Sequence, residues 1–449
     1  MRLTTDVLVI GSGTAGYTLA LALRKAGLQV AVTDDKPYGG TCGMHGCEPE
    51  KFLVAAAQVV KLSHQMSEIG IHPPAQIDWP ALMRSKSAFT DGVPDRTERA
   101  LETAGAQLFR GTARFVTPEE VAVGDDTTIR ARAVVVATGA RTAPLDFPGA
   151  EITVTPQAFM DFPAIPRRVV FIGGGCLSLA MAHVARAAGA AVTVLQRGDR
   201  ILKVLDGDLA ARVAKSAQAD GIQIGTGVEV SMVEPFGGAL VAYGKKGCTE
   251  AFACDLVVNG SGRVADLSKL ELGAGQVAYG TGGVKVNEYL QSVSNPLVWA
   301  IGDACDSPFH LSVVDDMEAE VAADNIVNGK RSIPDYASIP SVVSTLPAAA
   351  QVGMTEQQAR ASGIDFRLNR GTMEGWPSSR RIGQRYGFYK IMVEQGSGRI
   401  VGAHLFGHNA AETINIFALA MKHAIPAQEL KKMLWAYPTE VSDLRDMIS

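Results

Sequence analysis

Apolar runs separated by glycine-rich turns open the chain and predict a strand, a helix and a second strand in succession. These elements span 7–10, 14–26 and 30–33. The same order returns about 160 residues later. There the predicted elements are 168–172, 176–188 and 191–195. Two such units are typical of a chain that contains two parallel-sheet folds of Rossmann type.

The second half of the chain has a different pattern. An apolar strand at 297–301 precedes an alanine-rich helix at 313–327, and the stretch 329–340 is rich in proline and serine, as linkers are. Beyond it the pattern predicts strands at 387–393 and 400–405 and helices at 409–422 and 427–434. The predicted fold class is therefore α/β, with two Rossmann-like dinucleotide-binding domains and a separate C-terminal α+β domain.

Length and composition narrow the class of protein. A chain of 449 residues is too long for one core, and about three domains are expected. A net charge of −4 without a long basic run argues against a nucleic-acid or membrane surface. The first residues lead straight into a strand, so we expect no signal peptide and a cytoplasmic protein. Of six cysteines, only Cys42 and Cys47 are closely spaced, which does not fit a disulfide scaffold.

The first glycine turn lies between a predicted strand and a predicted helix. It consists of Gly11, Ser12, Gly13, Thr14, Ala15 and Gly16. Glycines allow the backbone to approach a pyrophosphate, and the helix N-terminus supplies partial positive charge. Asp34 ends the second strand, where a carboxylate accepts hydrogen bonds from ribose hydroxyls. This turn predicts a bound dinucleotide.

The second glycine turn contains Gly173 and Gly175, and the residues after its second strand suggest which nucleotide binds. Gln196 stands where NAD-type sites have a carboxylate, and Arg197 and Lys203 follow. A 2′-phosphate would be held by these cations, so we expect NADPH rather than NADH. The alternative is a solvated basic turn without this role.

The segment from Cys42 to Cys47 is the candidate reactive element. Five residues of α-helix rise about 7.5 Å, more than the roughly 6.8 Å that a disulfide spans between Cα atoms, so Cys42 is expected to lie off the helix. A thiolate near a helix start has a depressed pKa. Two structural thiols or half of a zinc site are the alternatives. No second pair with zinc spacing occurs in the sequence, so no metal site is predicted.

These motifs together resemble the pyridine nucleotide-disulfide oxidoreductases, with glutathione reductase, lipoamide dehydrogenase and mercuric reductase as relatives. The resemblance spans the whole chain and rests on GSGTAG at 11–16, GGTCGMHGC at 39–47, ATGA at 137–140, GSGR at 260–263 and AIGDA at 300–304. It implies FAD, a homodimer, Cys42 as the thiol that exchanges with substrate and Cys47 as the thiol that contacts the flavin. Ala137, Thr138, Gly139 and Asp303 would bind FAD. Further cofactor-binding residues would be Gly40, Thr41, Lys51, Gly262 and Gly302, and Lys51 would also be catalytic.

The resemblance also suggests domain boundaries. The first part of an FAD domain would span 1–148 and its second part 267–335. An NADPH domain would span 149–266, and 336–449 would form the dimerisation domain.

The chain departs from the family at its C-terminus. The family has His-Pro-Thr followed by a glutamate, and this His–Glu pair is the acid–base catalyst. Here Tyr437 replaces the histidine and Ser442 the glutamate. A phenol donates a proton readily but is a poor base at pH 7. His45, between the cysteines, is the alternative base, and a surface loop histidine is the simpler interpretation of it.

Other positions also differ from the family. Ala180 replaces a glutamate that relatives pair with a lysine near the flavin, and Glu50 is a possible new partner for Lys51. Mercuric reductases share the tyrosine but carry a C-terminal cysteine pair, which residues 444–449 lack. Ser312 and Asp315 fit a capping box for the helix that follows, which gives them a structural role.

The expected function is therefore an FAD- and NADPH-dependent disulfide oxidoreductase. Electrons would pass from NADPH through FAD to Cys42–Cys47 and on to an acceptor that the sequence does not name. One alternative is reduction of a metal ion such as mercuric ion. Another, from a different class, is a redox sensor or electron-transfer partner protein.

Overall fold

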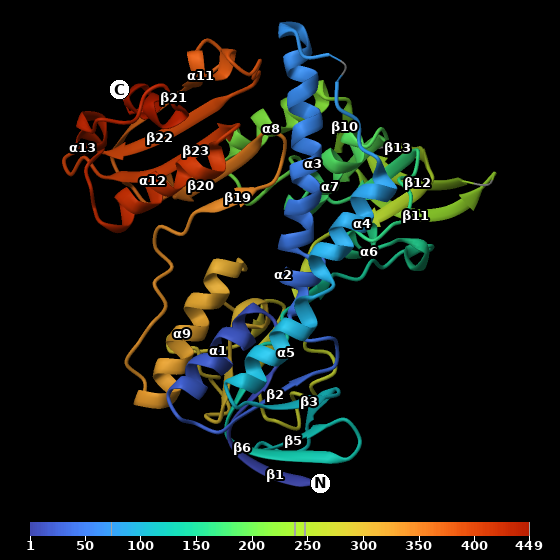
Figure 1. The fold of residues 1–449 in the computed structure, drawn as a ribbon, viewed down its shortest axis with the longest axis vertical. Coiled ribbons are helices and arrows are strands. Elements are labelled where there is room, and N and C mark those ends of the chain that lie inside the picture. Colours follow the sequence, from blue (N-terminus) through green and yellow to red (C-terminus); the bar gives the residue numbers. More distant parts are fainter. Residues whose placement is uncertain (73, 238, 247, 449) are drawn as a thin grey trace. The chain divides into compact units, whose positions relative to one another are not determined.

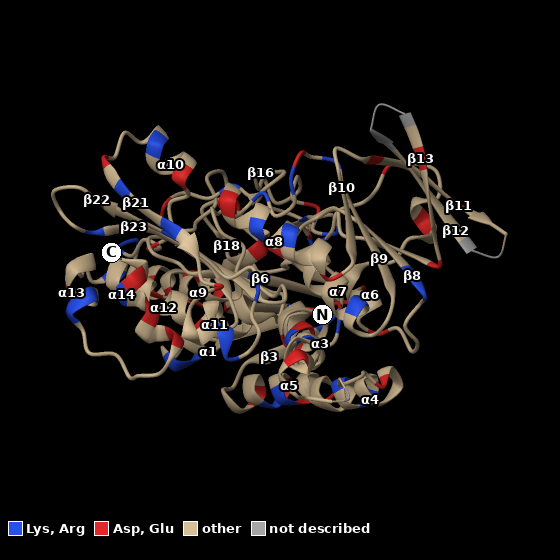
Figure 2. Ribbon diagram, turned by 90° about the horizontal axis from the view of Figure 1, so that it is seen from above, with Lys and Arg blue, Asp and Glu red and all other residues tan. Residues whose placement is uncertain are grey.

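The computed structural model describes residues 1–72, 74–237, 239–246 and 248–448 (Figure 1). The chain forms two compact units. Unit 1 comprises residues 1–49, 85–143 and 263–336, and unit 2 comprises 50–84, 144–262 and 337–449. Figure 2 shows Lys and Arg mixed with Asp and Glu along the elements of both units. Among the residues that the structure describes, no helix is long and apolar enough to cross a lipid bilayer.

Unit 1 is built on a seven-stranded sheet in the order β3-β2-β1-β6-β5-β4, in which β18 also pairs with β6. The strands are β1 (Arg2–Ile10), β2 (Val30–Asp34), β3 (Gln107–Arg110), β4 (Ala113–Phe115), β5 (Glu120–Val123), β6 (Thr127–Val136) and β18 (Val298–Ala300). The pairs of β1 with β2, β1 with β6, β2 with β3 and β6 with β18 are parallel. One edge of β6 is shared, because β5 pairs with residues 127–130 and β18 with residues 134–136.

Helices α1 (Thr14–Lys25) and α9 (Ser312–Asn328) contact each other and pack on this sheet (Figure 1). Leu19 and Leu23 of α1 and Ala319 of α9 are fully buried in the same core as Val9 and Val135 of the sheet. The remaining elements of unit 1 are α2 (Gly40–His45), α5 (Val93–Thr103), β7 (Ala140–Thr142), β15 (Arg263–Ala265), β16 (Tyr279–Gly280), β17 (Gly283–Val284) and η3 (Gly302–Ala304).

Unit 2 contains the second β-α-β fold and the C-terminal region. A parallel sheet has the order β10-β9-β8-β14, and an antiparallel sheet has the order β11-β12-β13. Their strands are β8 (Arg168–Ile172), β9 (Ala191–Gln196), β10 (Ile222–Thr226), β11 (Glu229–Phe236), β12 (Ala239–Lys246), β13 (Cys248–Cys254) and β14 (Leu256–Asn259). The associated helices are α7 (Cys176–Ala187), α8 (Gly207–Ala219), α6 (Pro156–Phe159) and η2 (Ala150–Ile152).

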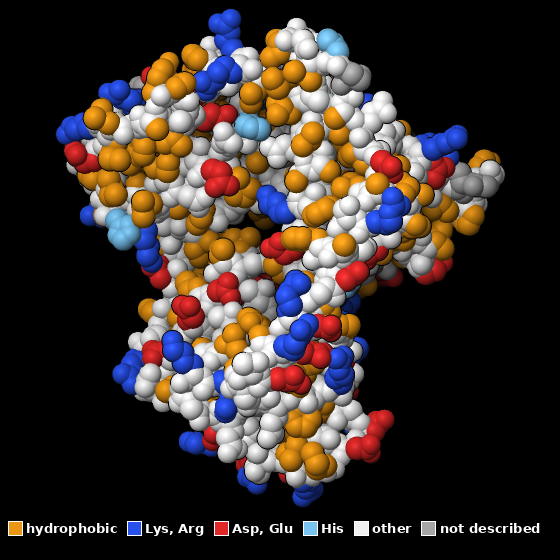
Figure 3. Space-filling model, viewed as in Figure 1, with side chains coloured by type: hydrophobic (Ala, Val, Ile, Leu, Met, Phe, Trp, Pro, Cys, Tyr) orange, Lys and Arg blue, Asp and Glu red, His pale blue; other side chains and the backbone are white. Residues whose placement is uncertain are grey.

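The C-terminal region is a five-stranded antiparallel sheet in the order β19-β20-β23-β22-β21. Its strands are β19 (Ser341–Val343), β20 (Ala348–Gly353), β21 (Phe366–Thr372), β22 (Phe388–Glu394) and β23 (Ile400–Gly407). Its helices are α10 (Glu356–Ala361), α11 (Pro377–Arg380), α12 (Ala410–Lys422), α13 (Ala427–Lys432), η4 (Glu440–Asp443) and α14 (Leu444–Met447). On the face seen in Figure 3, hydrophobic side chains gather over the region of α12 and α13.

Helices α3 (Cys47–Met66) and α4 (Trp79–Thr90), with η1 (Ser67–Ile69) between them, contribute residues to both units. Within unit 2, the α3 residues Leu53 and Ala57 are buried in one core with Phe171 of β8 and Leu179 of α7.

A buried ionic cluster ties α8 to the C-terminal sheet. Lys390 of β22 is 1% exposed, and its Nζ lies 2.8 Å from Asp206, 2.7 Å from Asp208 and 2.8 Å from Glu356. A buried ammonium is tolerated because it is paired and fully hydrogen-bonded.

Candidate active site

The first glycine turn lies at the carboxyl ends of the parallel strands β1, β2 and β6. Gly11 has φ +108°, and a Cβ there would lie 2.2 Å from the carbonyl oxygen of Ala137. Only glycine allows this approach. Asp34 Oδ2 accepts hydrogen bonds from the backbone N–H of Ser12 at 2.8 Å and from its hydroxyl at 2.6 Å. The carboxylate predicted to hold a ribose thus also fixes the turn beside it.

Two buried polar atoms in the described part of unit 1 have no hydrogen-bond partner. They are Thr138 Oγ1, directly after β6, and Asp315 Oδ1, in the first turn of α9. Thr138 belongs to the predicted FAD-lining segment with Ala137 and Gly139. Buried polar groups are rarely left unpaired, so a bound group with hydrogen-bonding atoms fits this place. Together with the open glycine turn, these atoms fit a dinucleotide such as FAD.

Gly302 and Asp303 belong to the short helix η3, which follows β18. The backbone N–H of Gly302 donates to the buried Glu318 Oε2 at 2.7 Å. Asp303 lies 3.3 Å from Arg263 and 3.7 Å from His310. These contacts hold the turn after β18 in place.

The two candidate redox cysteines lie on two successive helices. Cys42 is inside the short helix α2, and Cys47 is the first residue of α3. Cys42 lies off the helix that Cys47 begins, as expected, but it belongs to a short helix of its own. A break at Gly46 (φ −135°, ψ −116°) separates the helices, so the rise of one continuous helix does not apply. Both sulfurs are free thiols, with Cys42 half-buried and Cys47 exposed.

Helix α2 begins against the first glycine turn. Gly40 has φ +67°, and a Cβ on it would lie 2.3 Å from Cα of Gly13. Thr41 follows in α2 and is half-buried. This backbone approach places the cysteine segment directly beside the predicted dinucleotide turn.

Ser312 is a site residue that the sequence pattern did not reveal. Its hydroxyl lies 3.3 Å from the sulfur of Cys42 and 3.3 Å from the sulfur of Cys47. The expected capping box is wrong, because the N-cap of α9 is Leu311 and no side chain caps the helix. Ser312 is the first residue of α9, and its hydroxyl is directed to the thiol pair. One feature of the sequence could have indicated Ser312 as a site residue. It is a hydroxyl residue at the start of the helix that follows Gly302 and Asp303.

The thiol pair shares protons unequally. The pKa of Cys42 is lowered to about 6, chiefly by the hydrogen bond from Cys47 and further by hydrogen bonds from Ser312 and Thr14, although burial opposes this. The same bond, together with burial, raises the pKa of Cys47. The reduced pair therefore carries one negative charge at neutral pH, which the two sulfurs share across their hydrogen bond and which the hydroxyls of Ser312 and Thr14 stabilise. A thiolate, not a thiol, is the nucleophile in disulfide exchange.

The second glycine turn repeats the geometry of the first. Gly173 has φ +98°, and a Cβ there would lie 2.3 Å from the carbonyl oxygen of Gly260. Gly175 is the N-cap of α7. Gln196 Oε1 accepts from the backbone N–H of Gly174 at 2.8 Å, as Asp34 does in the first turn. A neutral amide thus fixes the turn without adding negative charge.

The basic residues after β9 differ in their contacts. Arg200 donates to the carbonyl oxygens of Leu205 and Lys203, which gives it a structural role. Arg197 is 80% exposed and lies 3.6 Å from the exposed Glu229. The Lys203 side chain extends to Gly198, since a Cβ there would lie 2.7 Å from its Nζ. Arg197 and Lys203 are therefore the cations of this turn that remain accessible to an anion.

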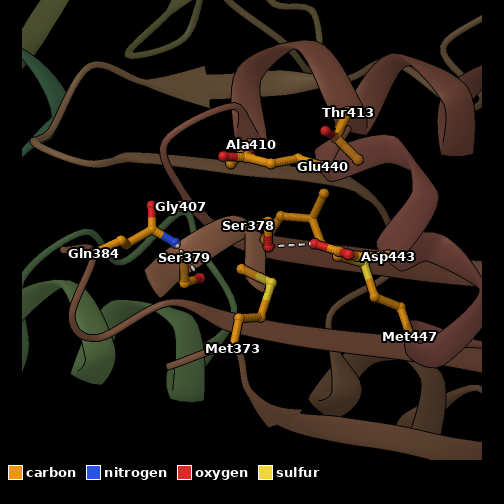
Figure 4. Close-up of a pocket in the computed structure, with 11 residues that line it drawn as sticks. Met373, Ser378, Ser379, Gln384, Gly407, Ala410, Thr413, Glu440, Asp443 and Met447 are labelled. Carbon is orange, nitrogen blue, oxygen red and sulfur yellow. Dashed lines mark hydrogen bonds between the residues drawn. The ribbon is translucent and has the colours of Figure 1, made fainter. Parts of the chain in front are cut away.

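The segment that carries Tyr437 is anchored on both sides of a pocket in the C-terminal region. Glu440 accepts from the backbone N–H of Asn409 at 3.0 Å, and Asp443 accepts from the Ser378 hydroxyl (Figure 4). Burial raises the pKa of both carboxyls. The Ser442 hydroxyl donates to the carbonyl oxygen of Thr439.

Tyr437 itself is 81% exposed. The anchored segment therefore presents its phenol outward, and Ser442 is engaged with the backbone and does not orient it.

The remaining predicted residues lie on helices or turns. Lys51 is exposed on α3, and His45 is exposed at the end of α2. Ala180 is fully buried in α7, and Gly262 has φ +135° in the turn after β14. The described part of the chain contains no cluster of three or more His, Cys, Asp or Glu side chains placed to bind a metal ion.

Comparison with known proteins gives the same class that fold and site define. The model of the pyridine nucleotide-disulphide oxidoreductase family matches residues 5–325, and that of its dimerisation domain matches residues 339–448. Glutathione reductase of Burkholderia cepacia is 30% identical over 447 residues, covering 97% of this chain and 96% of its own. Dihydrolipoyl dehydrogenase of Chlamydia pneumoniae is 29% identical over 441 residues, covering 97% and 94%.

A solved structure is similar over its full length. The Cu(II) complex of the HOCl-induced flavoprotein disulfide reductase RclA from Escherichia coli has a TM-score of 0.88 at 25% identity, covering 99% of both chains. The chain belongs to the pyridine nucleotide-disulphide oxidoreductase family. It is a flavin-dependent enzyme of a family that binds FAD and uses a pyridine nucleotide.

Proposed function

We propose that this enzyme is a homodimeric, NADPH-dependent disulfide reductase that passes electrons from NADPH through FAD to the Cys42–Cys47 pair. The observation that carries the proposal is the contact of one hydroxyl, that of Ser312, with both sulfurs. A hydroxyl within reach of both sulfurs can stabilise whichever of them is the thiolate, which suits a pair that alternates between disulfide and dithiol. The family relationship supplies the flavin chemistry.

Bound FAD would supply the two electrons that reduce the Cys42–Cys47 disulfide, after taking them from NADPH as a hydride. The chain's own residues then act on the acceptor. The Cys42 thiolate attacks one sulfur of an acceptor disulfide, a mixed disulfide forms, and the leaving thiolate takes up a proton. Cys47 next attacks the Cys42 sulfur, which restores the Cys42–Cys47 disulfide and releases the second thiol. The acceptor gains the two electrons that the thiol pair loses.

FAD is proposed to lie on unit 1 and to be held by residues of four segments. These are Gly11, Gly13, Thr14, Ala15, Gly16 and Asp34; Gly40 and Thr41; Ala137, Thr138 and Gly139; and Gly302 with Asp303. Lys51 and Gly262, which belong to unit 2, are further proposed cofactor-binding residues. The domain boundaries suggested by the family, 1–148 with 267–335, 149–266 and 336–449, are part of the same proposal.

The choice of NADPH is supported by the second glycine turn. Gln196 leaves the turn without a carboxylate, and Arg197 and Lys203 are accessible cations. A 2′-phosphate would replace Glu229 as the partner of Arg197 and add a charge-assisted hydrogen bond.

A homodimer is supported by the match to a dimerisation domain. Exposed apolar side chains on this domain include Leu419, Met433 and Leu434, which is 91% exposed. Tyr437 lies next to them and is proposed to reach Cys42 of a second copy and to donate a proton to the leaving thiolate. A compartment that keeps thiols reduced, such as the cytoplasm, fits a free thiol pair.

Reduction of a metal ion is the second candidate. It is favoured by the similarity to a protein that was solved as a Cu(II) complex. A thiolate pair is a suitable soft ligand for such an ion as substrate.

One panel of acceptors tests the proposal. Purified enzyme with NADPH is given a series of small disulfides, quinones, Cu(II) and Hg(II), and the loss of NADPH absorbance is followed. Steady turnover with a disulfide is expected. Turnover with metal ions alone would establish the second candidate. Rapid flavin reduction without turnover on any acceptor would contradict both and favour a redox sensor or electron-transfer partner.

A further inference from the structure

The carboxyl group of Asp315 is an acid in an unusual place. It lies three residues after Ser312 on α9, and its Oδ1 atom is buried without any hydrogen-bond partner. An ionised carboxylate accepts several hydrogen bonds and is costly to bury without them. A protonated carboxyl, which also donates, is easier to accommodate here.

The surroundings of Asp315 are acidic. From η3 it faces Asp303, from its own helix Asp316 and Glu318, and from the start of α3 Cys47. Burial is the largest cause, followed by the electrostatic effect of these four groups, and together they raise the pKa of Asp315 to about 8. The Arg263 guanidinium and the His310 imidazole lie beside Asp303 instead, at 3.3 Å and 3.7 Å. Asp315 therefore keeps its proton at neutral pH.

The unpartnered oxygen lies among the segments that are proposed to bind FAD. A Cβ on Gly302 would lie 3.0 Å from Asp315 Oδ1 and 3.1 Å from Cβ of Ala15. Gly302 belongs to the turn after β18, and Ala15 belongs to the first turn of α1, directly after the glycine turn. Asp315 Oδ1 thus occupies the narrow space where these two segments meet.

We propose that Asp315 is a protonated FAD-positioning residue that donates a hydrogen bond to an oxygen of the ribityl–pyrophosphate part of FAD. This inference rests on the proposed FAD site of unit 1. The pyrophosphate of FAD is an anion. A neutral Asp315 is compatible with this anion, whereas an ionised Asp315 would repel it. FAD binding is consequently coupled to one proton, and it weakens as pH rises through the pKa of Asp315.

The direction of this pH dependence follows from the linkage between FAD binding and protonation of Asp315. Below pH 8 the carboxyl is already protonated, so FAD binding requires no proton uptake and its affinity is constant. Above pH 8 each binding event must first protonate Asp315, so the dissociation constant rises. For a bound-state pKa one unit or more above the free value, the rise between pH 7 and pH 9 is about fivefold or more.

The test measures the dissociation constant of FAD by dilution of the holoenzyme, followed by flavin fluorescence, at pH 7, 8 and 9. Three proteins are compared: the parent, Asp315→Asn and Asp315→Ala. The parent is expected to show the rise. Asp315→Asn keeps an N–H donor without a titrating proton, so its dissociation constant should match the parent at pH 7 and stay flat. Asp315→Ala should bind FAD more weakly at pH 7 and also stay flat.

The possible outcomes distinguish the role of Asp315 from FAD binding itself. An equal rise in the parent and in Asp315→Asn would show that another group titrates, and it would overturn the inference while FAD binding stands. Binding by Asp315→Ala as tight as in the parent at pH 7 would overturn it as well, because the hydrogen bond would then contribute nothing. Absence of FAD from all three proteins at every pH, with intact circular dichroism, would overturn the proposed FAD site and the inference with it.

Discussion

The hydroxyl of Ser312 lies 3.3 Å from the sulfur of Cys42, although the two residues are 270 positions apart in the chain. The first residue of α9 therefore contributes directly to the acidity of a thiol on α2. Because the same hydroxyl lies 3.3 Å from Cys47, it can serve whichever sulfur carries the charge.

Ser312→Ala is expected to make Cys42 less acidic. A hydrogen bond to a charged group contributes about 1.5–3 kcal/mol, which corresponds to roughly one to two pKa units. The effect should lie near the lower end, since Cys47 remains the main donor. The measurement is the pH profile of iodoacetamide alkylation of the reduced protein, whose midpoint should move up from about 6. Ser312→Thr keeps the hydroxyl and is the control, and an unchanged midpoint in the alanine variant would remove Ser312 from the site.

The two cysteines are expected to differ in their spectra. If Cys47 contacts the flavin, Cys42→Ser leaves a lone Cys47 thiolate and gives a permanent long-wavelength absorption band in the oxidised enzyme. Cys47→Ser should abolish the band that the parent shows after two-electron reduction. The measurement is the visible spectrum of each variant during titration with dithionite. A band in Cys47→Ser and none in Cys42→Ser would reverse the two roles.

Arg197 and Glu229 give a matched pair of variants for nucleotide choice. Arg197→Ala should weaken NADPH binding about 10–150-fold and NADH binding little, because it removes a charge-assisted contact of about 1.5–3 kcal/mol. Glu229→Gln removes the present partner of Arg197, which lies 3.6 Å away, and should strengthen NADPH binding modestly. Dissociation constants for both nucleotides are the measurement. An equal loss for NADPH and NADH in Arg197→Ala would mean that this cation does not read the 2′-phosphate.

Tyr437→Phe tests the proton donor. It keeps the ring and removes the hydroxyl, and loss of one transition-state hydrogen bond costs about 10²–10³ in rate. We expect slower reoxidation of the reduced Cys42–Cys47 pair by the best acceptor, while flavin reduction by NADPH, the internal control, is unchanged. Reoxidation as fast as in the parent would leave Tyr437 as an interface residue and make His45 the better candidate.

The buried ionic cluster around Lys390 is expected to contribute to folding stability but not to the redox chemistry. Lys390→Met leaves Asp206, Asp208 and Glu356 without their shared cation and should lower the free energy of unfolding by about 3–5 kcal/mol. Lys432→Met breaks an exposed pair with Glu429 and should cost less than about 1 kcal/mol. Urea unfolding of both variants is the measurement. Similar losses in the two variants would contradict the role of burial.

The same cluster predicts a pH dependence. Burial is the largest single cause and acts to raise the pKa of Asp206, but the hydrogen bonds from Lys390 and from the backbone N–H of Glu356, together with the positive charge of Lys390, outweigh it, and the folded-state pKa is lowered from 3.8. A carboxyl with a depressed folded-state pKa contributes stability above its unfolded pKa, and this is lost as pH falls through the folded value. The contribution of the cluster should therefore be intact at neutral pH and disappear below about pH 4. Equal acid sensitivity of Lys390→Met and the parent would contradict this.

The sequence predicted the secondary structure around both glycine turns closely. The strand at 168–172 matches β8 at both ends, and the helix at 176–188 exceeds α7 by one residue. Apolar runs bounded by glycines leave little freedom there, because a buried strand and a following helix are local patterns. The replacement of a carboxylate by Gln196 at the end of the strand could also be predicted from its position in the sequence.

Contacts between residues far apart in the sequence could not be predicted in this way. Ser312 and Asp315 have the spacing of a capping box, and only the position of Leu311 as N-cap frees Ser312 for the thiols. The spacing of the two residues is that of a capping box, but the Ser312 hydroxyl contacts the thiols and does not cap the helix. Likewise, nothing near Lys390 in the sequence indicates Asp206, 184 positions away, as its partner.

The shared edge of β6 has a consequence for synthesis of the chain. Residues 134–136 of β6 pair with β18, which begins at Val298, so this half of the edge stays open until much of the protein has left the ribosome. An unpaired strand edge invites association with other chains, and contacts so distant in sequence form slowly. The turn at Gly302 and Asp303 directly follows β18. Because this turn belongs to the proposed FAD site, we expect a nascent chain to capture the cofactor only when this sheet closes, late in biogenesis.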